Sequence, residues 1–75
     1  MDVNILKGKI VERCGTIQEF CDRAVFNRST FDRKLNGKSE FTMEEVRRIV
    51  NVLSLSEDET RNIFLPMWLR KNVTY

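Results

Sequence analysis

Five basic side chains gather between positions 23 and 38, where Asp32 is the single acid. They are Arg23, Arg28, Arg33, Lys34 and Lys38. The whole chain carries a formal net charge of only +2, so this cluster is a local feature. Such a density of cationic groups attracts a polyanion, and arginine can also pair with guanine through two parallel hydrogen bonds. A solvated helix face with no partner is the alternative.

The sequence has few residues suited to catalysis, cofactor binding or metal binding. The chain has no histidine, no phosphate-cradling glycine loop and no reactive-thiol motif, so we expect neither an enzyme nor a cofactor. Cys14 and Cys21 fall at apolar helix positions, which favours buried thiols over a disulfide or metal ligands. Acidic pairs such as Glu44-Glu45 are typical of helix N-termini, where the dipole favours negative charge.

The basic cluster must be positioned by helices. Apolar spacing predicts a first helix that ends at Gly15, followed by a short second helix over residues 17 to 24. Thr16 and Glu19 have the spacing of a capping box that opens the second helix. Two more capping boxes begin at Thr42 and Ser56 and open the fourth and fifth helices.

A third helix is expected over residues 28 to 35, with Asn27 as its N-cap and Asn36-Gly37 as its stop. Only residues 25 to 27 separate it from the second helix, a connection suited to the steep crossing of a helix-turn-helix. On a helical wheel Phe31 and Leu35 share one face. The opposite face carries Arg33, flanked by Ser29 and Asn36.

The fifth helix is expected to end at or near Leu65, because Pro66 cannot donate to the helical ladder and clashes with the residue before it. Strand-like alternation is absent. The sequence therefore predicts an all-α fold with one compact five-helix domain over residues 1–66 and a tail over residues 67–75.

The segment from residue 18 to residue 38 resembles the phage repressor and Cro family, the lambda repressor-like helix-turn-helix proteins of the xenobiotic-response-element type. The shared pattern is an apolar-small pair, a polar cap, a Ser/Thr-Thr-apolar run and a closing Asn-Gly-Lys, here Phe20-Cys21, Asn27, Ser29-Thr30-Phe31 and Asn36-Gly37-Lys38. Helix order and length also agree, so the resemblance covers residues 3 to about 65. Residues 6–12 and 34–38 are further similar to short regulators encoded by prophages of Gram-positive bacteria.

The resemblance implies a sequence-specific transcriptional regulator, a repressor or Cro-like protein, whose third helix enters the major groove of duplex DNA. It implies that Arg28, Ser29 and Arg33 face bases, and that Asn36 and Lys38 hold the DNA backbone. The full set of expected DNA contacts comprises Thr16, Gln18, Asn27, Arg28, Ser29, Thr30, Asp32, Arg33, Asn36 and Lys38.

Three residues depart from the family pattern. Val25 stands where the turn usually has glycine, and a β-branched residue resists positive φ. Ile17 stands where many members have a phosphate-binding glutamine, for which Thr16 or Gln18 can substitute. Asp32 repels phosphate unless it accepts a hydrogen bond from a cytosine amino group or orients a neighbouring arginine.

Dimerisation and a protein partner are further expectations. A homodimer on a near-palindromic operator would use the fifth helix and the tail. Met67-Trp68-Leu69 form an apolar cluster that either completes the core or binds another regulatory protein, as an antirepressor does. Phe20, Phe26, Phe31 and Phe41 fall at core positions rather than on a base-stacking surface.

We expect a cytoplasmic, nucleoid-associated location with no membrane partner. The residues at the start, Met1-Asp2-Val3-Asn4, have neither the basic flank nor the apolar stretch of a secretory signal.

Overall fold

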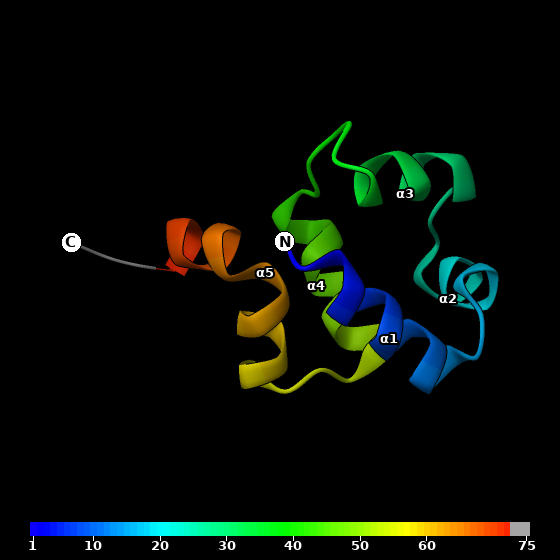
Figure 1. The fold of residues 1–75 in the computed structure, drawn as a ribbon, viewed down its shortest axis with the longest axis horizontal. Coiled ribbons are helices and arrows are strands. Elements are labelled where there is room, and N and C mark those ends of the chain that lie inside the picture. The colour runs from blue at the N-terminus through cyan, green and yellow to red at the C-terminus, as the bar shows by residue number, and fades with distance from the viewer. Residues whose placement is uncertain (73–75) are drawn as a thin grey trace.

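The computed structural model describes the backbone of residues 1–72 and the side chains of residues 1–64. Within this range the chain is all-α and contains no strand, as expected (Figure 1). The five helices are α1 (Val3–Cys14), α2 (Ile17–Ala24), α3 (Arg28–Leu35), α4 (Met43–Leu53) and α5 (Glu57–Asn72). None of them is long and apolar enough to cross a lipid bilayer, as far as the described residues show.

Side-chain caps set where the helices begin. The reciprocal bonds of a capping box are present at Thr42, which pairs with Glu45, and at Ser56, whose hydroxyl and N–H both bond to Glu59. At Thr16 only half of the predicted box forms. The Thr16 hydroxyl accepts a hydrogen bond from the Glu19 N–H at 3.0 Å, but the Glu19 carboxylate instead accepts one from Arg23. The Glu19–Arg23 ion pair therefore replaces the bond that the Glu19 carboxylate would accept from the Thr16 N–H in a complete capping box.

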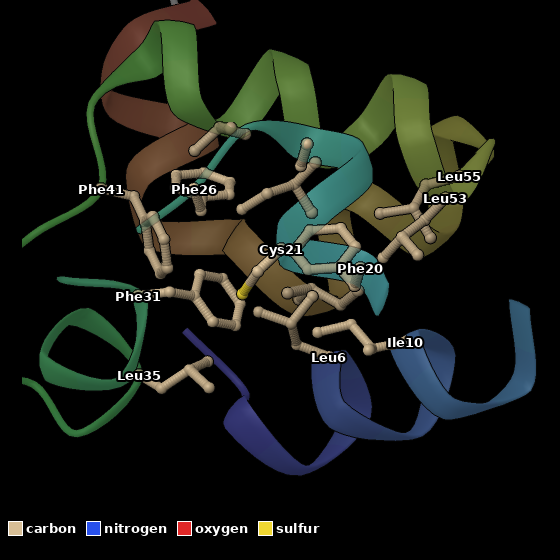
Figure 2. Packing of buried hydrophobic residues seen from close by; sticks show 14 of the residues in the cluster. Leu6, Ile10, Phe20, Cys21, Phe26, Phe31, Leu35, Phe41, Leu53 and Leu55 are labelled. Atoms are coloured by element: carbon tan, nitrogen blue, oxygen red, sulfur yellow. The ribbon is translucent and has the colours of Figure 1, made fainter. Parts of the chain in front are cut away.

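A cluster of phenylalanine rings runs from one side of the core to its middle (Figure 2). Phe20, Phe26, Phe31 and Phe41 are all buried, and their neighbouring ring centroids lie 5.2 to 6.1 Å apart. These separations are favourable for aromatic pairs. The prediction that the phenylalanines form core rather than a surface platform is confirmed.

The two cysteines differ in exposure. Cys21 is fully buried beside Phe20 and Phe31, whereas Cys14 is only partly buried at the end of α1. The prediction of a buried thiol is therefore confirmed for Cys21 and is wrong for Cys14, which lies at the end of α1 and remains partly exposed. Burial raises the pKa of the Cys21 thiol, because desolvation disfavours the thiolate.

The helices pack around α1 and α2, and α3 lies at the edge of this arrangement. α1 contacts α2, α4 and α5, while α3 packs on α2 and extends along the upper edge in Figure 1. α3 buries Phe31 and Leu35. The opposite side of α3 is consequently left to solvent.

The prediction that the fifth helix ends at or near Leu65 is confirmed for its first segment, but the helical continuation beyond Pro66 was not predicted. The first segment of α5 ends in a kink at Phe64, where φ is −115° and ψ is 23°, and a second helical segment then continues to Asn72. A proline is tolerated in the first turn of a helix, where its missing N–H has no intrahelical acceptor. The kink makes Pro66 part of such a first turn. The side chains of Met67, Trp68 and Leu69 lie outside the described residues.

Candidate nucleic-acid interface

The turn between α2 and α3 consists of residues 25–27 and is anchored by Phe26. Val25 adopts the left-handed conformation, with φ 58° and ψ 48°, and its side chain is 78% exposed. The N–H groups of Val25 and Phe26 both donate to the Cys21 carbonyl. The backbone thus takes the positive φ that favours glycine, although a valine is present.

Arg48 of α4 braces this turn, a role that the sequence did not indicate. Its Nη1 donates to the carbonyls of Ala24 and Val25, at 3.1 and 3.0 Å. Its guanidinium carbon lies 4.5 Å from the Phe26 ring centroid, within cation–π range. These bonds satisfy carbonyls that the end of α2 leaves free, so Arg48 stabilises the turn that leads into α3.

Two of the expected contact residues are helix caps. Thr16 caps α2, and the Asn27 Oδ1 accepts a hydrogen bond from the Thr30 N–H at 3.1 Å and caps α3. Both side chains are exposed and lie at the N-termini of adjacent helices. Backbone N–H groups in such places favour anions, including phosphate.

The outer side of α3 carries exposed polar groups. Ser29, Thr30, Arg33 and Asn36 are all exposed, while Phe31 and Leu35 are buried on the other side. The wheel prediction of an inner and an outer face is therefore confirmed for this helix.

The end of α3 closes with paired hydrogen bonds. The Gly37 N–H donates to the Lys34 carbonyl at 3.2 Å, and the Lys38 N–H donates to the Arg33 carbonyl at 2.9 Å. This is a Schellman motif, in which Gly37 takes φ 80°. It leaves the Lys38 side chain exposed directly beyond the helix.

Arg28, Asp32 and Gln18 form one polar group between α2 and α3. Arg28 Nε donates to Asp32 Oδ1 at 3.1 Å, and Arg28 Nη1 donates to Gln18 Oε1 at 3.3 Å. The sequence left two roles open for Asp32, a bond to a cytosine amino group or the orientation of an arginine. In the structure its carboxylate is bonded to Arg28. Ile17, the residue of α2 that departs from the family pattern, is partly buried and packs against the core.

Much of the basic cluster is paired within the protein. Arg23 pairs with Glu19, Arg28 with Asp32, and Lys34 with Glu45, in the last case with Nζ 2.6 Å from Oε2. Lys34 is therefore held towards α4. Among the ion pairs of the described side chains, Arg33 and Lys38 take part in none.

The Lys34–Glu45 pair is well shielded from solvent, since the two side chains are 13% and 14% exposed. Burial raises the pKa of the Glu45 carboxyl, but hydrogen bonds from Lys34 and from the Thr42 N–H outweigh this and lower the pKa below its usual value. Glu45 thus stays ionised and fastens α3 to α4.

The described part of the chain is an all-α protein of five helices. A three-residue turn precedes α3, and the outer side of α3 is exposed and polar. Residues 1–66 match the family described as "Protein of unknown function (DUF739)", and the chain belongs to this family. No curated protein and no solved structure matches the chain.

Proposed function

We propose that this protein is a sequence-specific DNA-binding transcriptional regulator, with α2 and α3 as a helix-turn-helix and α3 in the major groove. The observation that carries the proposal is the exposed outer face of α3, where Ser29 and Arg33 lie opposite buried Phe31 and Leu35. The resemblance to phage repressor and Cro proteins supports the same assignment.

The groups on this surface divide by the part of DNA they suit. Ser29, in the first turn of α3, and Arg33, further along the same helix, suit base edges, and Thr30 suits either a base or a phosphate. Thr16, Asn27, Asn36 and Lys38 surround the helix and suit phosphates, which position a protein without specifying sequence.

Selection from a random duplex library tests this proposal. We expect enrichment of a defined site by the wild-type protein. We expect Arg33→Ala to cost about 1 to 3 kcal/mol of binding free energy and to relax one base position. Arg47→Ala, which removes an exposed arginine from α4, serves as the control and should leave the selected site unchanged. Recovery of no site above background, with a correctly folded protein, would remove the proposal.

We further propose that the protein binds as a homodimer, which would make the selected site an inverted repeat. The two copies of α3 would then lie about 34 Å apart, to meet successive major grooves. Sedimentation with operator duplex should show two protein chains on each DNA. A single chain on the selected duplex at high micromolar concentration contradicts the dimer and leaves DNA binding intact.

The finer biological setting follows from the same proposal. A short prophage regulator of Gram-positive bacteria would act at the nucleoid, by occupying an operator. Reporter expression from the selected site, with and without the protein, distinguishes repression from activation.

A further inference from the structure

Four polar side chains form a continuous chain across the edge where α2 meets α3. Gln18 Nε2 donates to Asp22 Oδ1 at 3.0 Å, and Gln18 Oε1 accepts from Arg28 Nη1 at 3.3 Å. Arg28 Nε in turn donates to both Asp32 oxygens, at 3.1 and 3.3 Å. The Arg28 head group is thus held from two helices.

The bonds that hold Arg28 leave a particular part of its guanidinium free. Of the five N–H donors of an arginine, one on Nε and one on Nη1 are engaged. Three N–H groups remain, two of them on Nη2. The remaining donors, one on Nη1 and two on Nη2, are enough for the O6 and N7 acceptors of guanine.

We propose that Asp32 and Gln18 are positioning residues that hold Arg28 as a guanine-reading group, and that Asp32 sets the base specificity without touching a base. This proposal rests on the proposed DNA binding. It assigns Asp32 to arginine orientation rather than to a cytosine amino group. A restrained arginine loses less conformational freedom on binding, and it presents a fixed pair of donors.

The local charge favours a base over a phosphate as the partner of Arg28. Asp22, Asp32 and Arg28 together carry a formal charge of −1, whereas Arg33 and Lys38 have no acidic partner among the described side chains. Asp32, which is bonded to the guanidinium, and Asp22, which is reached through Gln18, both repel phosphate oxygens. A base edge carries no net charge and escapes most of this repulsion.

The test compares duplex-library selection by the wild type, Arg28→Ala, Arg28→Lys and Asp32→Asn. Glu19→Gln is the matched control, because it also removes one negative charge from an i,i+4 pair with arginine. The two acids are similarly exposed, 48% for Glu19 and 45% for Asp32. Thermal unfolding confirms that each variant is folded before its selected site is compared.

We expect the wild type to prefer guanine at one position by about 5- to 150-fold over other bases. Arg28→Ala and Arg28→Lys should both lose that preference, since lysine cannot form the paired bonds. Asp32→Asn should weaken the preference at the same position and bind unselected DNA several-fold more tightly. Glu19→Gln should share only the gain for unselected DNA.

Three results would overturn the inference. If Asp32→Asn keeps every base preference while Arg28→Ala loses one, Asp32 is only a helix-stabilising partner and DNA binding stands. If Asp32→Asn loses a cytosine preference that Arg28→Ala retains, Asp32 reads that base directly. If the wild type selects no site, the proposed function fails and the inference fails with it.

Discussion

At the scale of single residues, Val25 is a valine in a conformation that suits glycine. Left-handed backbone places Cβ close to the following carbonyl oxygen and costs an L-residue roughly 1 to 2 kcal/mol. The side chain recovers little of this cost, because it is 78% exposed. The turn is therefore strained where α3 is set at its angle to α2.

Val25→Gly should stabilise the protein by about 0.5 to 1 kcal/mol, since relief of the strain exceeds the extra entropy that glycine gives the unfolded chain. Urea unfolding measures the change. Val11→Gly is the control, because Val11 is also exposed, at 54%, but lies inside α1. There the same substitution should destabilise the protein by about 0.5 kcal/mol or more. A loss of stability in Val25→Gly would show that the turn is not strained.

At the scale of elements, α4 supports the turn before α3 through Arg48. The Arg48 guanidinium bonds two carbonyls at the end of α2 and stacks on Phe26. Arg48 is separated from these two carbonyls by 24 and 23 positions in the sequence. It replaces solvent at a helix terminus, so its removal leaves partly buried carbonyls without donors.

Arg48→Leu should lower the free energy of unfolding by about 1 to 3 kcal/mol and speed amide exchange in the turn at residues 25–27. Native-state hydrogen exchange locates the second effect. Arg47→Leu changes the neighbouring exposed arginine and should do neither. Equal exchange of the turn amides in both variants would contradict the brace.

The helix bounds could be predicted from the sequence because they depend on neighbours. Thr42 and Ser56 each find their capping partner three residues away, and Gly37 supplies positive φ at the end of α3. Contacts between residues distant in the sequence leave no such local pattern. The bonds from Arg48 to the turn and the Lys34–Glu45 ion pair are two contacts of this kind.

The kink in α5 shows a second limit of local patterns. A proline near an apolar stripe indicates a break in the helical ladder, and the break occurs at Phe64. Whether the chain resumes a helix beyond it depends on the backbone after the proline. The sequence therefore predicted an irregularity in nearly the right place and the wrong continuation.

At the scale of the whole molecule, Glu59 of α5 and the α1 residue Arg13 together link three helices. Its carboxylate lies 2.7 Å from Lys9 Nζ and 2.9 Å from Arg13 Nη2, both on α1. Arg13 also donates to the Leu53 carbonyl at the end of α4. The hydrogen bond from Lys9, followed by that from the Ser56 N–H, lowers the pKa of Glu59 from its ordinary value of 4.5 to about 2.

This pKa predicts acid sensitivity with a definite sign. A carboxyl with a folded-state pKa below its unfolded value contributes stability above pH 4.5, and that contribution is lost as the pH falls towards 2. Glu59→Gln should lower the melting temperature at pH 7 and flatten its fall between pH 4.5 and 2. Glu57→Gln, at a side chain that is 74% exposed on the same helix, should leave the wild-type pH dependence intact. A Glu59→Gln curve parallel to the wild type throughout this window would contradict the assignment.

The pairing of charges also determines how strongly salt should weaken DNA binding, if α3 docks as proposed. Counting all five basic residues of the cluster as phosphate contacts gives a slope of log K against log salt of about −4.5 for each protomer. Arg23, Arg28 and Lys34 are already paired within the protein and Arg33 is assigned to a base edge, which leaves Lys38 as the phosphate contact of the cluster. One contact gives a slope of about −0.9, and Lys38→Ala should bring the slope close to zero. Titrations of the selected duplex from 50 to 200 mM salt measure both slopes. A wild-type slope near −4.5 would mean that DNA pulls the internal pairs apart, whereas a slope near −0.9 means that these pairs survive in the complex.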